Sequence, residues 1–299
     1  MISIAMTTYN GEMYLREQLD SILTQTRTDF EIVVCDDCSR DSTPKILAEY
    51  AIKDSRFRIY ENEKNLGYRK NFNKAVSLCK GEFIAFSDQD DIWLPNHLDT
   101  LINHIGENLV CGGATVRCLE NGDLLNVLSP TKHQAKTLNS QVNRLVYQCY
   151  AFNLYQGASQ MISRKAAELY FPIEKDAFAH DWALATNAIA ENKFVYVNEV
   201  ITKWRKHPSQ VTNKRDSRKT RKERLATFVL LLLKNNKRIA KVPVIVAVLE
   251  KAAEFHTNTS ILYRLKNLSH SWRISKIIYA RATFGTLKTV VGYFFTASL

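Results

Sequence analysis

Three acidic side chains follow a short apolar segment in the first third of the chain. Phe83–Phe86 is apolar enough to form a buried strand, and Ser87-Asp88-Gln89-Asp90-Asp91 comes directly after it. In an open α/β sheet, ligands bind at the C-terminal ends of the strands. Carboxylates this close together repel one another unless a cation or a bound ligand offsets their charge. The segment therefore indicates a ligand or cation site, and the alternative is a solvated acidic turn ahead of the helix that Pro95 opens.

Two earlier apolar segments also end in polar or acidic residues. Ile2–Met6 leads into Thr7–Asn10, and Phe30–Cys35 leads into Asp36 and Asp37. Segments with apolar residues at helical spacing separate the predicted strands, which is typical of a parallel sheet with helices on its faces. No βα turn carries a GxGxxG or a Walker phosphate loop, which argues against a dinucleotide-binding domain. We therefore expect an α/β fold that binds its ligand with acids at one sheet edge.

Length and composition are those of a globular protein with one large domain or two smaller ones. The chain has 299 residues, 45% hydrophobic and 24% charged. The N-terminus enters a strand at once, so we expect no secretory signal. Six cysteines without paired spacing predict reduced thiols in a cytosolic protein. Cys35 and Cys38 form a C-x-x-C that could bind zinc or act in redox chemistry, but coincidence at a strand end is the stronger interpretation.

The positive charge is concentrated in the C-terminal region. From Lys214 on, the chain holds 18 Lys and Arg against 4 Asp and Glu, a balance of +14, which leaves −3 for residues 1–213. The apolar helical segment Leu225–Leu233 is too short to span a membrane. Ser271–Leu299 mixes aromatic with basic residues, as in a helix that lies in a membrane interface. The alternative is a helical cap packed on the core with its basic face in water.

Several spaced motifs together resemble the inverting family 2 glycosyltransferases. The match covers about residues 1–212 and leaves the basic region outside it. Its motifs are Ile4–Asn10, Gln25-Thr26 with Phe30–Ser39, Asn65-Leu66-Gly67, and Gly81–Asp91. Ser87–Pro95, with His180-Asp181-Trp182 and Trp204–Pro208 downstream, is most similar to the rhamnosyltransferase-like branch.

The resemblance implies a GT-A fold of α/β class, with a mostly parallel twisted sheet flanked by helices. Residues 1–108 would bind the nucleotide sugar, residues 109–213 would form the acceptor half, and residues 214–299 would be a basic, amphipathic helical region. A UDP- or dTDP-linked donor is implied. The residues expected to bind the donor are Thr7, Tyr9, Glu12, Asp36, Asp37, Arg69, Lys70, Asp88 and Gln89.

The resemblance assigns different tasks to the donor-binding residues and to the acids beside them. Asp37, with Asp36 beside it, would accept from N3–H of uracil or thymine, and Asp88 would meet the ribose. Asp90 would hold Mg²⁺ or Mn²⁺ across the diphosphate, because hard oxygen ligands favour such ions. Asp91 would be either a further metal ligand or an acid behind the ligands. Arg69 and Lys70 would offset phosphate charge, unless they are only a surface helix start.

Asp181 is the candidate base of an inverting transfer, which needs one carboxylate to take the proton from the acceptor hydroxyl. Its alternative is a helix N-cap. The family more often has Glu-Asp here, so His180 places the local pKa in question. His207 would ligate the metal or touch the diphosphate, and its alternative is a turn residue before Pro208.

The sequence thus predicts an inverting, metal-dependent glycosyltransferase that extends a bacterial surface glycan, with rhamnose as one candidate sugar. We expect a glycan or lipid-linked glycan acceptor and peripheral contact of the C-terminal region with the inner face of the cell membrane. Two alternatives remain. The basic region could bind nucleic acid, although the chain has no nucleic-acid-binding motif and its acids would repel phosphate, so no such partner is expected. The fold could also serve as a non-catalytic scaffold in glycan biosynthesis, against which the intact acids argue.

Overall fold

The computed structural model describes residues 1–128, 138–150, 153–173, 179–210 and 218–258, with residues 260, 262–263 and 267. The strands are β1 (Ile2–Thr8), β2 (Phe30–Asp36), β3 (Phe57–Glu61), β4 (Phe83–Ser87), β5 (Ile92–Trp93), β6 (Val110–Leu119), β7 (Leu124–Leu128), β8 (Gln160–Ser163) and β9 (Phe194–Lys206). The helices are α1 (Leu15–Leu23), α2 (Thr43–Lys53), α3 (Tyr68–Leu78), α4 (His97–Ile105), α6 (Gln141–Tyr150), α7 (Arg164–Tyr170), α8 (His180–Ala190), α9 (Arg218–Asn235) and α10 (Pro243–Thr257), with short 3₁₀ turns at Gly157–Ser159 and Ile239–Lys241.

All described strands belong to one mixed sheet. Its order is β3-β2-β1-β4-β8-β6-β9-β5, and β7 pairs with β6 outside that path. The strands β1 to β4 pair in parallel, as do β6 and β9, whereas β8, β7 and β5 join antiparallel. Parallel pairing brings the C-terminal ends of β1, β2 and β4 to one edge, where the acidic residues follow. Strand β4, from residues 1–108, pairs with β8, from residues 109–213, so both predicted halves contribute strands to one sheet. The division into a donor half and an acceptor half stays a prediction.

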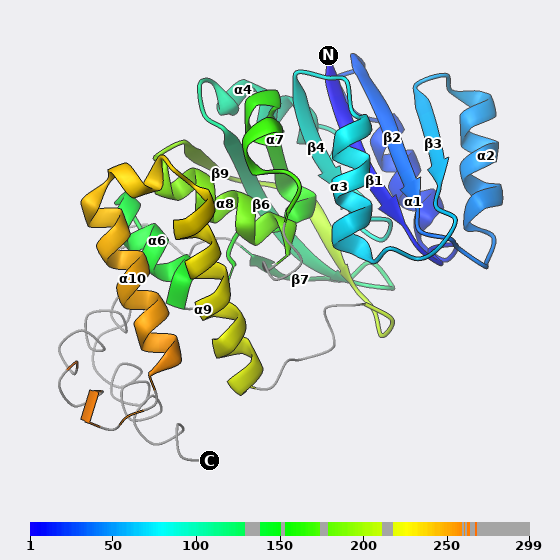
Figure 1. Cartoon of the computed structure of the whole chain (residues 1–299). Helices are drawn as coiled ribbons and strands as arrows, with labels where there is room; N and C mark the ends of the chain where they lie inside the picture. The colour runs from blue at the N-terminus through cyan, green and yellow to red at the C-terminus, as the bar shows by residue number, and fades with distance from the viewer. Residues whose placement is uncertain are drawn as a thin grey trace.

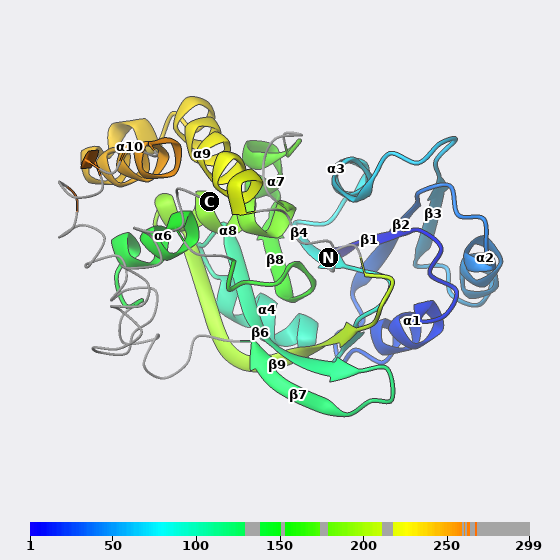
Figure 2. The ribbon, with the colours of Figure 1, turned by 90° about the horizontal axis from the view of Figure 1, so that it is seen from below.

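Alternate residues of the central strands supply two cores, one on each face of the sheet. Ile4, Ile32 and Val34 face a core with α1, α2 and α4, whereas Ala5 and Val33 face a core with α3 and α8. Figure 2 shows α1 and α3 on opposite sides of β1 and β2. In Figure 1, α9 and α10 pack as an antiparallel pair beside α6 and α8. Buried residues of that pair extend the second core: Val229, Leu232, Ile245 and Leu249.

The second half of the sheet differs locally from the sequence expectation. Tyr155–Ile162 looks like one strand, but Gly157–Ser159 forms a 3₁₀ turn and strand β8 begins at Gln160. Strand β5, which has two residues, and strand β7, which pairs with β6 across a short turn, are not apparent from the sequence. Two apolar segments, Phe194–Val197 and Val200 onward, instead form the single 13-residue strand β9, with register shifts against β6 between Gly113 and Thr115.

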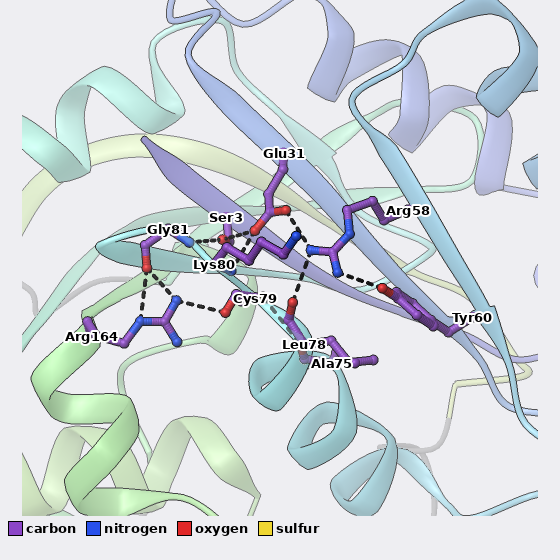
Figure 3. A network of polar contacts seen from close by, with 10 residues as sticks. All are labelled: Ser3, Glu31, Arg58, Tyr60, Ala75, Leu78, Cys79, Lys80, Gly81 and Arg164. Carbon is purple, nitrogen blue, oxygen red and sulfur yellow. Dashed lines mark hydrogen bonds and ion pairs between the residues drawn. The ribbon is translucent and has the colours of Figure 1, made fainter.

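A buried polar network fastens the α3–β4 turn to the N-terminal ends of the strands (Figure 3). The carboxylate of Glu31 accepts from Ser3 Oγ at 2.6 Å, from Lys80 N at 2.6 Å and from Arg58 Nη1 at 2.7 Å. Arg164, at the start of α7, donates to the Cys79 carbonyl at 2.8 Å. Although burial opposes the charge of Glu31, these donors hold its pKa below the usual range. The network lies at the sheet edge opposite the acidic loops.

No helix among the described residues is long and apolar enough to cross a membrane. Ser271–Leu299, for which an interfacial helix is expected, lies outside the described residues.

Candidate active site

The loop after β4 is tied to the loop after β1 by Gln89. The Gln89 side chain accepts from Tyr9 N at 2.7 Å and donates to Tyr9 O at 3.0 Å. A side chain at Gly11 would meet this amide, since its Cβ would lie 2.4 Å from Gln89 Oε1. The Gln89 side chain therefore joins the loop after β4 to the loop after β1. Gly11, which has no side chain, leaves space for it.

Asp90 and His207 come together although 117 positions separate them in the chain. His207 Nε2 lies 2.8 Å from Asp90 Oδ2, and the other ring nitrogen of His207 lies 2.7 Å from Ser209 Oγ. The His207 side chain is 5% exposed and that of Asp90 18%. His207 follows directly after the end of β9, so strand β9 delivers it to the loop of Asp90.

Arg205, two residues before His207, holds the main chain of the acidic loop. Its backbone N donates to Asp91 Oδ1 at 3.3 Å and its Nε donates to the Asp90 carbonyl at 3.1 Å. The guanidinium also pairs with Glu17 of α1. Asp91 is 1% exposed, and burial first, then Asp90 and Asp88, raise its pKa well above the usual range. One oxygen of Asp91 thus contacts β9, while Oδ2 is buried without a hydrogen-bond partner among the described residues.

The residues around Asp90 fit a divalent cation that takes most of its ligands from phosphate oxygens and water. Within the described part of the chain, no group of three or more His, Cys, Asp and Glu side chains is arranged to hold a metal ion. Asp90 and His207 nevertheless place one carboxylate oxygen and one imidazole nitrogen at a common point. Mg²⁺ typically takes one or two protein carboxylates and completes its shell with phosphate oxygens and water. Asp90 with His207 fits such a set, and the expectation that Asp91 is a further ligand or an acid behind the ligands stays a prediction.

Asp181 is fixed at the start of α8 by two hydrogen bonds. Its Oδ2 accepts from Asn153 Nδ2 at 2.9 Å and its Oδ1 accepts from Trp182 N at 2.8 Å. The N-cap position belongs to Ala179, so Asp181 lies inside the first turn and does not cap the helix. Burial raises its pKa to about 6, while the hydrogen bonds from Trp182 N and Asn153 lower it. The carboxylate is therefore ionised at neutral pH yet close to its pKa, as a general base requires.

The first turn of α8 packs directly on the C-terminal end of β4. The His180 ring lies 5.1 Å from that of Phe86 and 4.1 Å from that of Phe72. Gly157 lies against the other side, where a Cβ would come within 2.8 Å of His180 Nε2 and 3.3 Å of Asp181 Cβ. Burial lowers the pKa of His180 to about 3, so the ring is neutral. His180 therefore adds no charge beside Asp181.

The pKa of Asp88 responds to both Asp90 and Asp181. Burial raises its pKa to about 8, with Asp90 and then Asp181 adding to the shift. A carboxyl feels such neighbours only when they lie close to it. Asp88 and Asp90 follow β4, His207 follows β9, and Asp181 lies in the first turn of α8, which packs on the end of β4. The residues expected to bind ribose, hold a cation and take a proton therefore lie near one another.

Asp36 and Asp37 are buried at the end of β2, and both carboxylates already have three donors from the protein. Asp37 accepts from Asn62 Nδ2 at 2.8 Å, Leu66 N at 2.7 Å and Gly67 N at 2.8 Å. Asp36 accepts from Thr8 Oγ1 at 2.6 Å and from Ser39 Oγ at 2.6 Å and Ser39 N at 2.8 Å. A carboxylate offers about four acceptor positions, so each has about one left.

The remaining expected donor residues occupy different places. Thr7 is 7% exposed in β1, whereas Tyr9 is 47% exposed at the loop surface. Glu12 accepts from Ser42 N at 2.8 Å, which fastens its loop to the start of α2. Arg69 and Lys70 begin α3 and line a cavity of about 370 Å³ together with Leu66, Gly67, Tyr68, Asn73, Pro172 and Ile173.

Sequence reasoning missed Arg205, Tyr14 and Asn153. Arg205 could have been found, because alternate residues of a strand share a face and Arg205 stands two positions before His207. Asn153 has no local signal, since it meets Asp181 from 28 positions away. Tyr14 lies in the β1–α1 loop, and nothing in its sequence context points to β9.

The chain belongs to glycosyl transferase family 2, whose pattern matches residues 3–171. It is 31% identical over 211 residues to the uncharacterized glycosyltransferase MJ1057 of Methanocaldococcus jannaschii, covering 69% of this chain and 70% of that protein. It is 38% identical over 108 residues to WfgD of Escherichia coli, covering 36% of this chain but 42% of that protein, which is named a UDP-Glc:alpha-D-GlcNAc-diphosphoundecaprenol beta-1,3-glucosyltransferase. The protein is thus a glycosyltransferase, as the sequence predicts.

Solved structures confirm the GT-A-like α/β fold. The first 349 residues of S. aureus TarS, in complex with UDP-GlcNAc, match with a TM-score of 0.62 and 21% identity over 98% of this chain and 90% of that chain. The mannosyltransferase PcManGT of Pyrobaculum calidifontis, in complex with GDP-Man and Mn²⁺, matches with a TM-score of 0.55 and 17% identity over 99% of this chain and 85% of that chain.

Proposed function

We propose that this protein is an inverting, metal-dependent glycosyltransferase that moves a sugar from a nucleoside-diphosphate sugar with a pyrimidine base to a hydroxyl of a bacterial surface glycan. The observation that supports the proposal is that His207 Nε2 lies 2.8 Å from Asp90 Oδ2 while the ring of His180, next to Asp181, lies 5.1 Å from that of Phe86 at the end of β4. The relatives supply the context: WfgD acts on a lipid-linked acceptor by its name, and TuaG of Bacillus subtilis is named for teichuronic acid biosynthesis. The rhamnosyltransferase-like motifs make dTDP-rhamnose one donor to test.

The proposed roles follow from the local chemistry. Asp181 takes the proton from the acceptor hydroxyl. As it does so, the acceptor oxygen forms a bond to the anomeric carbon, and the bond from that carbon to the diphosphate breaks on the opposite face. No covalent intermediate with the enzyme is needed. Asp90 and His207 would hold a divalent cation, which would supply positive charge for the departing diphosphate. Asp88 binds the ribose, for which a carboxyl with a raised pKa can either donate or accept.

Hydrogen-bond capacity favours a pyrimidine base. Asp37 has about one acceptor position left after its three protein donors. Uracil and thymine present one donor, N3–H, whereas guanine presents N1–H and an adjacent amino group that together need two acceptors. We therefore expect UDP or dTDP to raise the melting temperature more than GDP does, at equal concentration with Mn²⁺.

The decisive experiment is a panel of nucleotide sugars assayed for release of nucleoside diphosphate with Mn²⁺ or with a chelator. Asp181→Asn and Asp90→Ala should each lower kcat at least ~100-fold at saturating donor and metal, a loss of about 3 kcal/mol or more in transition-state stabilisation. Asp54→Asn is a matched control, because Asp54 pairs with Arg56 in the α2–β3 turn. Full transfer by Asp181→Asn, or transfer unaffected by the chelator, would contradict the mechanism.

A further inference from the structure

Tyr14 stands where three separate parts of the chain meet beside the proposed cation site. It directly precedes α1, and its backbone N donates to the Gly11 carbonyl at 3.1 Å. The centroid of its ring lies 4.5 Å from that of His207, with the ring planes at 45°. The Arg205 guanidinium carbon lies 5.1 Å from the same ring, and the Tyr14 hydroxyl donates to Glu120 in the β6–β7 turn.

These contacts lead to Asp90 by two routes. Through His207, the ring of Tyr14 bears on the imidazole whose Nε2 lies 2.8 Å from Asp90 Oδ2. Through Arg205, it bears on the guanidinium whose Nε donates to the Asp90 carbonyl at 3.1 Å. Glu17, one turn further along α1, forms an ion pair with the same guanidinium. The start of α1 therefore contacts Arg205 through both the Tyr14 ring and the Glu17 carboxylate.

We propose that Tyr14 is a positioning residue that holds His207 and Arg205 in place around Asp90 and thereby sets the affinity of the site for a divalent cation. The inference rests on the proposed function, because it needs Asp90 and His207 to be the ligands. The aromatic ring carries the effect: it closes one side of His207, whose side chain is 5% exposed, and offers its face to a cationic group. The hydroxyl, directed at Glu120, serves only to fasten the β6–β7 turn.

The test measures Mn²⁺ binding to the full chain by the loss of the free-ion electron paramagnetic resonance signal, with UDP present to supply phosphate oxygens and UDP without protein as the blank. Removal of groups that orient metal ligands typically weakens metal binding about 10–100-fold. Tyr14→Ala should show a loss of that size, while Tyr14→Phe, which keeps the ring, should bind Mn²⁺ within about twofold of the wild type. Tyr60→Ala is the matched control: Tyr60 is also half-buried and hydrogen-bonded to a charged side chain, Arg58, but it lies in β3.

A second arm asks whether Tyr14 acts through His207. If it does, adding Tyr14→Ala to His207→Ala should weaken Mn²⁺ binding less than Tyr14→Ala does alone. Unchanged Mn²⁺ affinity in Tyr14→Ala, or an equal loss in Tyr60→Ala, would overturn the inference while leaving the proposed function intact. A wild-type protein that binds no Mn²⁺ even with UDP present would instead contradict the cation site itself, and the inference with it.

Discussion

At the residue scale, the chemistry of the site depends on how the protein balances one carboxylate. Burial favours the neutral form of Asp181, while the N–H groups of Trp182 and Asn153 favour the charged form, and the resulting pKa is about 6. A lower pKa would make the carboxylate a poorer base, and a higher one would leave it protonated at neutral pH. The neutral ring of His180 leaves this balance to the hydrogen bonds.

That balance predicts the pH dependence of transfer. Because Asp181 must be ionised to accept a proton, kcat should fall about tenfold per pH unit below pH 6. Asn153→Ala removes a hydrogen bond to the charged form, worth about 1 kcal/mol, so the acid limb should move up by roughly half a unit to one unit. Asn187→Ala, at the other end of α8, should leave the limb in place. A pH–rate profile measured on the three proteins checks this, and an unshifted limb in Asn153→Ala would rule out Asp181 as the group that titrates.

The same residue predicts a gain of stability when function is lost. The folded pKa of Asp181, about 6, lies above the unfolded value near 3.8, so its favourable contribution is complete below pH 3.8 and is lost as the pH rises through 6. At pH 8, replacing the buried charge by the neutral amide of Asp181→Asn should therefore raise the free energy of unfolding, by up to ~3 kcal/mol. Urea titrations at pH 8 and pH 4 test this, because the difference between variant and wild type should shrink at pH 4.

At the element scale, the parallel half of the sheet could be predicted because each of its strands is a compact apolar segment followed by a polar turn. In the other half, β6, β8 and β9 fall within apolar segments, whereas β5 and β7 could not be predicted. Strand β5 has two residues and forms by pairing with β9 far along the chain, and β7 forms by pairing with β6 across a short turn. The candidate site divides in the same way. Asp88, Asp90 and Asp181 belong to local motifs, whereas Asn153 and Tyr14 act across the fold. The need for glycine at position 157 could not be predicted from the sequence, because it depends on the close contact of Gly157 with the start of α8.

The network around Glu31 predicts a change of stability without a change of chemistry. Glu31→Ala would leave Ser3 Oγ, Lys80 N and the Arg58 guanidinium without their shared acceptor, which should cost about 2–4 kcal/mol of the free energy of unfolding. Since the pKa of Glu31 is lowered, its contribution is present above the unfolded value of 4.5 and is lost as the pH falls below it. Chemical denaturation at pH 7 should therefore show a larger deficit than at pH 3.5. The KM for the donor should not change, because the network lies at the opposite sheet edge.

At the scale of the whole molecule, the basic C-terminal region has two parts. Residues of α9 and α10 lie in the core that also contains α3 and α8, so residues 218–258 form a helical cap on the glycosyltransferase core. The cap interpretation of Ser271–Leu299 concerns residues outside the described part of the chain and stays a prediction. The aromatic and basic segment Ser271–Leu299 remains the candidate for membrane contact.

We therefore expect the full chain to float with vesicles that contain anionic phosphatidylglycerol, and less so as salt rises. Each Lys or Arg near such a surface contributes about 1 kcal/mol, so reversing four of them should weaken binding at least ~100-fold. The reversed residues are Arg273, Lys276, Arg281 and Lys288. The matched control reverses four exposed lysines of the described core: Lys45, Lys53, Lys64 and Lys193. Equal loss of flotation in the two variants would mean that net charge, and not this segment, attracts the membrane. Selective loss in the first variant, with donor turnover intact on a water-soluble acceptor, would assign membrane contact to this segment.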